Sequence, residues 1–294
     1  MQLAVTSCSN PALPGSQERL PALHDALAAY GYQMDLGPIQ ELASTAGDTA
    51  WRWDPQARAT LVNQAFADHD VAAVLDISGG DLAGEVLPYL DFETIRANPK
   101  PFVGYSDNSC VIGALPIPAL LWSPFAGVER GFSALNHAIA GRQVRPAITP
   151  YNSTAAHGNP QRFVEAPWVG GNLRCFLKLA GTRWWPDFSG KVLLIEALGG
   201  DLLTLAASLA QHRALGTFGD SPESLGVASS APVLRAAPSS RGCLAVVVGQ
   251  LTRLDQEGQR HVALQLIAEY AGHLPIFEAP TVGHSSDSDA VTLG

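Results

Sequence analysis

Three side chains that together could form a nucleophilic catalytic site occur far apart in the sequence. The first is Ser106, in the segment 102–108, where a predicted strand passes through Gly-x-Ser directly into a predicted helix. Such a turn exposes a serine hydroxyl. Asn108 stands where the general hydrolase motif has a second glycine, so Ser106 taken alone is first a candidate N-cap of its helix. A serine nucleophile also needs a base, commonly histidine, and a carboxylate that orients the histidine.

His284 and Glu196 are the candidate base and carboxylate. His284 follows the predicted strand 275–279 in a loop of small residues, at the strand end where open α/β sheets bind ligands. Glu196 ends the apolar strand 191–195, and a carboxylate at a strand tip must be solvated, paired or functional. The ordinary alternatives are a solvated loop histidine and a structurally paired carboxylate. The other histidines are expected on helix surfaces (His24, His69, His212) or in polar and loop settings (His137, His157, His261, His273).

A glycine pair follows another predicted strand, 71–77. The backbone N–H groups of Gly79 and Gly80 could bind an oxyanion, a carboxylate or a phosphate, and the alternative is a plain tight turn. The spacing does not fit GxGxxG, and GxxxxGK[ST] does not occur, so a dinucleotide or nucleoside triphosphate cofactor has no support. Without HExxH, paired histidines or an acidic loop, we predict no metal and no cofactor.

The elements that must position these residues follow an α/β pattern. Short apolar runs alternate with helix-period segments in the first half, which predicts a doubly wound, mostly parallel sheet. Residues 141–167 turn to Pro, Asn, Ser, Gly and Arg without periodicity, which is typical of a connection. We therefore predict an N-terminal α/β domain over 1–141, a linker over 142–167 and a smaller C-terminal α/β domain over 168–294, with the active site in the cleft between the domains.

The expected elements can be stated by range. Strands are expected at 3–6, 32–36, 71–77, 101–104, near 120, and at 192–195, 244–248 and 276–279. Helices are expected from about 16 to 30, over 54–68 with Asp54-Pro55 as its start, from 107 onward, from a small-residue start at 170–172, and over 202–215 and 262–270.

Composition excludes several classes of protein. Of 294 residues, 47% are apolar and 15% charged, which fits a folded protein with a large core and not a disordered chain or a coiled coil. The net charge of -9 disfavours nucleic acid and anionic membranes as partners. The four cysteines form no CxxC, and no leader or apolar span of about 20 residues occurs. We therefore expect reduced thiols and a cytoplasmic protein without membrane segments.

The order of the candidate residues and their surroundings resembles the serine LD-carboxypeptidase family, including its microcin C immunity branch. The matching blocks are SGGDLAGEVLPYLDFETIRANPKPFVGYSDNS (78–109), VGGNLRCFLKLAGT (169–182), KVLLIEA (191–197) and PIFEAPTVGHSS (275–286). The resemblance implies that Ser106 is the nucleophile, His284 the general base and then acid, and Glu196 the carboxylate that orients the imidazole.

The resemblance also implies a substrate and an oxyanion site. The oxyanion would be held by the backbone N–H groups of Gly80 and Asp107, with Gly79 and Asn172 also at the substrate. The family cleaves an amide next to a free carboxyl end, typically the L-to-D bond that releases D-alanine from murein tetrapeptide. It uses no metal and usually forms dimers, so a homodimer is expected here. Arg130, Arg174 and Arg183 have the charge to bind the substrate carboxylate, and the sequence does not select among them.

Two departures from the family pattern keep alternatives open. The glycine turn, 77–81, reads Ile-Ser-Gly-Gly-Asp where murein enzymes typically have Arg-Gly-Gly-Tyr-Gly, which favours the immunity branch. The chain ends at 292–294, where members commonly continue through a further strand, so weaker support for the His284 loop is expected. The main hypothesis is a serine carboxypeptidase acting on a short peptide or muropeptide. The alternatives are an amidase that cleaves aminoacyl-nucleotide antibiotics and a non-catalytic protein that binds a small ligand.

Overall fold

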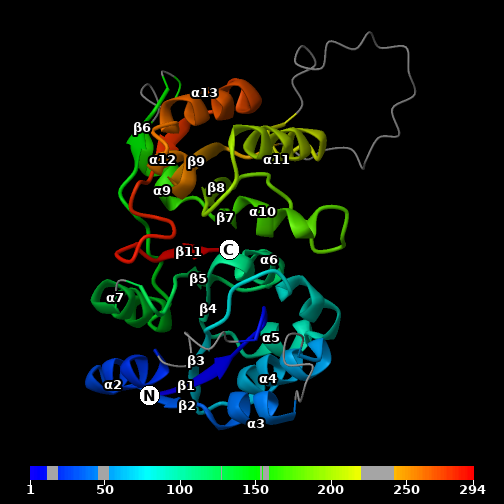
Figure 1. The fold of residues 1–294 in the computed structure, drawn as a ribbon, viewed down its shortest axis with the longest axis vertical. Coiled ribbons are helices and arrows are strands. Elements are labelled where there is room, and N and C mark those ends of the chain that lie inside the picture. Colours follow the sequence, from blue (N-terminus) through cyan, green and yellow to red (C-terminus); the bar gives the residue numbers. More distant parts are fainter. Residues whose placement is uncertain (12–18, 46–52, 127, 153, 155–158, 220–241) are drawn as a thin grey trace.

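Two mostly parallel β-sheets, each covered by helices, make up the fold (Figure 1). The computed structural model describes the chain except residues 12–18, 46–52, 127, 153, 155–158 and 220–241. The first sheet has the order β11-β5-β4-β3-β1-β2 and the second the order β6-β10-β9-β8-β7. Only the pairs β11 with β5 and β6 with β10 are antiparallel among the strand pairs of the described residues. The predicted α/β class is confirmed.

The strands are short and mostly buried. The first sheet contains β1 (Gln2–Thr6), β2 (Gln33–Asp35), β3 (Val71–Asp76), β4 (Phe102–Gly104), β5 (Ala119–Leu121) and β11 (Val291–Leu293). The second contains β6 (Thr149–Pro150), β7 (Trp168–Asn172), β8 (Val192–Ala197), β9 (Ala245–Leu251) and β10 (Ile276–Glu278). Apolar side chains fill both faces of the central strands, as expected when helices cover a parallel sheet on both sides.

Helices and 3-10 turns connect these strands. In the first half they are α2 (Leu20–Ala29), α3 (Gly37–Thr45), α4 (Pro55–Ala67), η2 (Ala83–Tyr89), α5 (Phe92–Ala97), η3 (Ser106–Asn108), α6 (Ser109–Ala114) and α7 (Val128–Ile139). In the second half they are α9 (Pro160–Glu165), α10 (Leu173–Phe176), η4 (Leu177–Leu179), α11 (Leu202–Ala214), α12 (Thr252–Gln256) and α13 (Arg260–Ala271).

The predicted start of α4, with Asp54 and Pro55, is confirmed. The Asp54 side chain accepts hydrogen bonds from the backbone N–H groups of Gln56 and Ala57, and Pro55 occupies the first turn. These contacts satisfy two of the N–H groups that a helix start leaves without a partner. The helix then packs against β1, β3 and η2.

Two strands lie outside the ranges in which the sequence placed their sheets. β6 falls in the predicted linker and pairs with β10, while β11 falls in the predicted C-terminal domain and pairs with β5 of the first sheet. The last strand in the sequence prediction is 276–279, and β11 is therefore an addition to it. Strands of two or three residues show no periodicity, and β11 pairs with residues about 170 positions away, so no local pattern reveals it.

Two further details differ from the sequence prediction. Gly170 and Gly171 lie in β7, and the helix expected to begin with them starts at Leu173 instead, with Asn172 as its N-cap. Helix α3 lies between the predicted strand 32–36 and the predicted helix 54–68, where the sequence prediction placed no element. The beginning expected for the first helix, near Ser16, lies outside the described residues.

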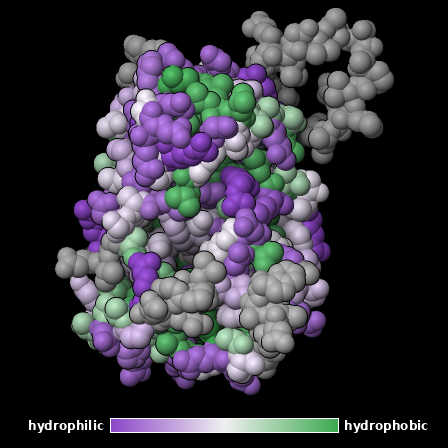
Figure 2. Space-filling model, viewed as in Figure 1, coloured by the Kyte–Doolittle hydropathy of each residue, from purple (hydrophilic) through white to green (hydrophobic). Residues whose placement is uncertain are grey.

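The face shown in Figure 2 is largely hydrophilic, with a hydrophobic area near its upper end, where α13 lies in Figure 1. Leu203 of α11 and Val262 of α13 leave 80% and 46% of their surfaces exposed. None of the helices in the described part of the chain has the length and apolar character needed to cross a bilayer.

Candidate active site

Ser106 lies at the sharp turn between β4 and η3. Its φ of 53° makes it the one non-glycine residue with positive φ in the described part of the chain. Such a backbone costs on the order of 1–3 kcal/mol and persists only where the surroundings hold it. A Cβ on Gly104 would lie 2.8 Å from Cβ of Asn108, which explains the glycine two residues before the serine. Tyr105 and Asn108 are the N-caps of η3 and α6, so the N-cap interpretation of Ser106 is wrong.

The imidazole of His284 lies between Ser106 and Glu196. His284 Nε2 is 3.2 Å from Ser106 Oγ, and Nδ1 is 2.7 Å from Glu196 Oε2. The side chain of Glu196 is fully buried, and that of His284 is 7% exposed. With the proton on Nδ1, the ring donates to the carboxylate and can accept the serine proton at Nε2. This is the arrangement by which a serine becomes a nucleophile.

The three residues come from three strand ends and from both sheets. Ser106 follows β4 of the first sheet, Glu196 lies near the end of β8, and His284 is in the loop after β10. Because these strands are parallel within each sheet, the residues occupy carboxyl ends, where open α/β sheets form ligand sites. The site therefore depends on how the two sheets face each other.

Two side chains hold the His284 loop in place. The hydroxyl of Tyr105 donates to the carbonyl of Gly283 at 2.5 Å, and its ring lies 4.5 Å from the imidazole between centroids. Burial, and then the charge of Glu196, raises the pKa of Tyr105 well above its usual range, so the hydroxyl stays a donor. On the other side, Gln250 accepts from the N–H of Ser285 and donates to its hydroxyl.

The glycine turn after β3 lies against the serine. A Cβ on Gly79 would be 4.0 Å from Cβ of Ser106, so the turn passes directly beside the candidate nucleophile. Gly80 has φ 134°, and a Cβ there would overlap the side chain of Asn10 at 2.2 Å, so this position requires glycine. The N–H groups of Gly80 and Asp107 make no hydrogen bond with any described residue, which leaves them free to donate to an oxyanion.

The buried carboxylate of Asp76 lies next to this turn and was not predicted from the sequence to belong to the site. Asp76, the last residue of β3, accepts hydrogen bonds from the backbone N–H groups of Cys8 and Ser78 and from the side chain of Asn108 at 2.6, 2.9 and 2.9 Å. It thereby ties the turn after β1, the glycine turn and η3 together. The signal was available, because Asp76 ends an apolar strand just as Glu196 does.

The side chain of Asp107 forms a second buried network beside the serine. It accepts from the hydroxyl of Ser9 at 2.5 Å and from the N–H of Ala83 at 2.8 Å, and it forms an ion pair with Lys178. Lys178 also donates to the carbonyl of Asp81. The sequence predicts a role only for the backbone N–H of Asp107. In the structure its carboxylate also holds η3 in place through these contacts.

Asn172 lies at the same junction, at the end of β7. Its side chain accepts from the N–H of Cys175 at 3.3 Å as the N-cap of α10, and its own N–H donates to the hydroxyl of Ser109 at 2.8 Å. The second bond connects the C-terminal sheet to the helix that follows the candidate nucleophile. Contact of Asn172 with substrate remains a prediction.

Other sequence candidates lie away from this constellation. His212 is fully buried in an aromatic environment and not on a helix surface, because the face of α11 that carries it packs inward. All four cysteines are buried and free. Among the described residues no group of three or more His, Cys, Asp or Glu could hold a metal ion.

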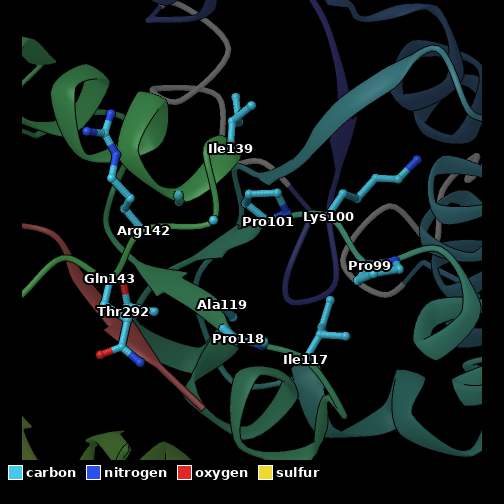
Figure 3. A pocket seen from close by; sticks show the side chains of 12 residues that line it. Pro99, Lys100, Pro101, Ile117, Pro118, Ala119, Ile139, Arg142, Gln143 and Thr292 are labelled. Atoms are coloured by element: carbon cyan, nitrogen blue, oxygen red, sulfur yellow. The ribbon is translucent and has the colours of Figure 1, made fainter. Parts of the chain in front are cut away.

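A groove at the opposite edge of the first sheet offers no comparable chemistry (Figure 3). Prolines and aliphatic residues at the amino ends of β4 and β5 form much of its lining. Lys100 extends away from Arg142 in this view, and its ammonium group donates to the carbonyl of Ala65 at the end of α4. The described residues that line the groove include neither a histidine nor a carboxylate.

Profiles of two protein-family domains match this chain. The profile of the LD-carboxypeptidase N-terminal domain matches residues 3–117, and that of the C-terminal domain matches residues 165–222. The murein tetrapeptide carboxypeptidase of Pseudomonas aeruginosa is 25% identical over 254 residues, which cover 79% of this chain and 74% of that protein.

Similarity also extends to a second kind of protein. The microcin C7 self-immunity protein MccF of Escherichia coli is 26% identical over 176 residues, 47% of this chain and 51% of MccF, so this match spans about half of the relative's length. A solved structure of MccF in complex with aspartyl sulfamoyl adenosine has a TM-score of 0.71 at 17% identity and covers 100% of this chain and 91% of that one. At that identity the likeness concerns the fold.

Proposed function

The chain belongs to the LD-carboxypeptidase family, and we propose that it is a serine carboxypeptidase that hydrolyses an amide bond next to the free carboxyl end of a short peptide or muropeptide. The observation that carries the proposal is the position of His284, with one ring nitrogen at the hydroxyl of Ser106 and the other at the carboxylate of Glu196.

In the proposed mechanism, His284 accepts the proton of Ser106 at Nε2 while Oγ attacks the substrate carbonyl carbon. Glu196 holds Nδ1–H and stabilises the positive charge that the ring acquires. The tetrahedral intermediate then collapses, the C–N bond breaks, and His284 gives its proton to the departing amine. An acyl-enzyme on Ser106 remains, and water activated by the same imidazole releases the acid and restores the hydroxyl.

The backbone donors of the site act on the charge that develops on the carbonyl oxygen. The N–H groups of Gly80 and Asp107 are the proposed oxyanion donors, and each such donor typically contributes about 2.7–4 kcal/mol to the transition state. Gly79, beside Ser106, leaves room for the substrate on this side. Only neutral imidazole can accept the serine proton, so turnover should fall when the solution is acidified.

A second candidate function is that of an immunity-type amidase, which would cleave an aminoacyl-nucleotide with the same three residues. The similarity to MccF and the Ile-Ser-Gly-Gly-Asp turn support it. The third hypothesis is a non-catalytic binding protein. A geometry of Ser106 and Glu196 incompatible with His284 would have favoured it, and the observed distances do not provide that support.

We also propose where the protein acts and in which oligomeric state. A carboxypeptidase that trims muropeptides would serve peptidoglycan recycling in the cytoplasm, and we propose that it acts as a homodimer. The apolar side chains of Leu203 and Val262, exposed on α11 and α13, are compatible with such a contact. Sedimentation of the purified chain tests the dimer.

Mass-spectrometric product analysis tests the function. Purified protein is incubated with murein tetrapeptide and, separately, with a processed aminoacyl-adenylate antibiotic, and Ser106→Ala is the control. Release of D-alanine by the parent alone supports the carboxypeptidase, and cleavage of the nucleotide conjugate alone supports the amidase. Equal cleavage by parent and Ser106→Ala would contradict both.

A further inference from the structure

An ion pair at the edge of the glycine turn brings a guanidinium close to the reacting groups. Arg174 on α10 donates from Nη1 to Oδ1 of Asp81 at 2.5 Å. Asp81 directly follows Gly80, a proposed oxyanion donor, and Gly79 lies against Ser106. Helix α10 also packs against η3, which carries the serine. The ion pair is therefore part of the rim around the candidate oxyanion site.

The ion pair with Asp81 leaves most N–H donors of the Arg174 guanidinium unused. The contact joins one nitrogen to one carboxylate oxygen, whereas an arginine has five N–H donors arranged to bind a carboxylate through two of them. The side chains of Arg174 and Asp81 are 62% and 61% exposed. An exposed pair contributes only about 0–1 kcal/mol, so a second carboxylate can displace Asp81 at little cost.

Lys178 and the other two candidate arginines make their contacts elsewhere. Lys178, one turn after Arg174, points inward to the buried carboxylate of Asp107. Arg183 lies over the ring of Trp184, 4.7 Å from its centroid. Arg130 donates to Asp289, in the segment that follows the His284 loop, at 3.0 Å. Of the three arginines that the sequence left open, Arg174 is the one attached to the glycine turn.

The chemistry of the leaving group fixes where its carboxylate must lie. In a substrate that loses one C-terminal residue, only the amide nitrogen and one Cα separate the scissile carbonyl from the carboxylate. If the carbonyl oxygen is held at the N–H of Gly80, the carboxylate must lie within a few ångströms of the turn that carries Asp81. A guanidinium already holding a carboxylate at this place is suited to bind it.

Resting on the proposed carboxypeptidase function, we propose that Arg174 determines specificity by binding the free carboxylate on the leaving-group side of the substrate. Asp81 holds the guanidinium in place until the substrate carboxylate replaces it. The protein then selects peptides with a free carboxyl end.

The test compares murein tetrapeptide with the same peptide carrying a C-terminal primary amide, which removes one charge and little else. Binding of both peptides to Ser106→Ala protein is measured by calorimetry, with and without Arg174→Met, and kcat/KM is measured in the active background. We expect Arg174→Met to weaken binding of the acid about 10- to 100-fold and to leave binding of the amide within about threefold, because a hydrogen bond to a charged group is lost.

Two further variants show whether an effect on the preference for the acid is specific to the guanidinium of Arg174. Arg130→Met is the matched control, since Arg130 has the same exposure of 62% and a similar single contact with an aspartate; it should not change the preference for the acid. Arg174→Lys keeps the charge without the paired donors and should restore part of the preference. Thermal unfolding of each variant confirms that the fold is retained.

The outcomes separate this inference from the function on which it rests. If Arg174→Met weakens binding of the acid but not of the amide, the result supports the role proposed for Arg174. If the parent cleaves the acid and Arg174→Met keeps the full preference for it, the inference is overturned and the carboxypeptidase stands. If neither peptide binds to Ser106→Ala or is cleaved by the parent, both are overturned for this class of substrate.

Discussion

Two histidines in the second half of the chain have largely covered side chains but opposite surroundings. His284 lies between a serine hydroxyl and a buried carboxylate. His212, on α11, stacks on Phe176 with 6.2 Å between ring centroids and an angle of 6°, and it also contacts Trp185 and Phe218. Its Nδ1 is 3.1 Å from the hydroxyl of Thr217, and its Nε2 makes no hydrogen bond within the described part of the chain.

The comparison shows that partners, not burial, decide what a histidine does. Burial lowers the pKa of His212 to about 4, because nothing in its aromatic environment balances a positive charge. At His284 the carboxylate of Glu196 is ready to balance the charge that proton transfer creates. The first ring is therefore a packing element, and the second is placed to move protons.

The largest expected effect is that of removing the hydroxyl which His284 faces. Ser106→Ala should lower kcat by about four orders of magnitude or more, because the nucleophile is lost. Ser208→Ala on α11 is the matched control and should keep parental kcat. The rates are measured by D-alanine release, and thermal unfolding should show both variants folded. Parental turnover in Ser106→Ala would show that Ser106 is not the nucleophile and that His284 does not act on it.

Replacing the carboxylate that distinguishes the two histidines should have the next largest effect. Glu196→Gln keeps the size of the side chain but removes the negative charge, so His284 loses both its orientation and the stabilisation of its charged form. We expect kcat to fall by roughly three to four orders of magnitude. If kcat of this variant stays within about tenfold of the parent's, the carboxylate does not have the role assigned to it.

His212 should affect stability in acid and not catalysis. Its lowered pKa means that the unfolded chain binds a proton more tightly, so its contribution to stability is present above pH 6.5, the ordinary value, and is lost as the pH falls toward 4. His212→Phe should flatten this fall by on the order of 2–3 kcal/mol. Urea unfolding between pH 7 and pH 4 measures it. Equal pH slopes for parent and variant would contradict the assignment.

The smallest expected effect concerns the support of the His284 loop. Tyr105→Phe keeps the ring against the imidazole but removes the hydrogen bond to Gly283. A neutral hydrogen bond is worth about 0.5–1.5 kcal/mol, so kcat/KM should fall by about 2- to 12-fold. A rise in activity would show that the bond restrains the loop in a less productive position.

Much of the site could be predicted from the sequence because its residues follow apolar strands. Ser106, Glu196, His284 and Gly80 each come after such a run, and strand ends of a parallel sheet are easily located. Their mutual distances could not be derived from local patterns, since they depend on contacts between two sheets. The family resemblance supplied the pairing of these residues, and the structure supplied the distances.

The sequence was least informative where position depends on distant contacts. His212 was expected on a surface, although the face of α11 that bears it packs against aromatic residues from other elements. The strand β11 was missed for the same reason, because it pairs with residues far away in the sequence. Periodicity reports which face of an element is apolar, and it does not report which polar residue on that face finds a partner.

The central claim is that His284 and Glu196 activate Ser106, and labelling with a fluorophosphonate tests it most directly. We predict that the parent is labelled at Ser106, that His284→Ala loses the labelling, and that His212→Phe is labelled at the parental rate. Peptide mapping by mass spectrometry locates the adduct. Equal labelling of His284→Ala and the parent, or an adduct at another residue, would show that His284 does not activate Ser106.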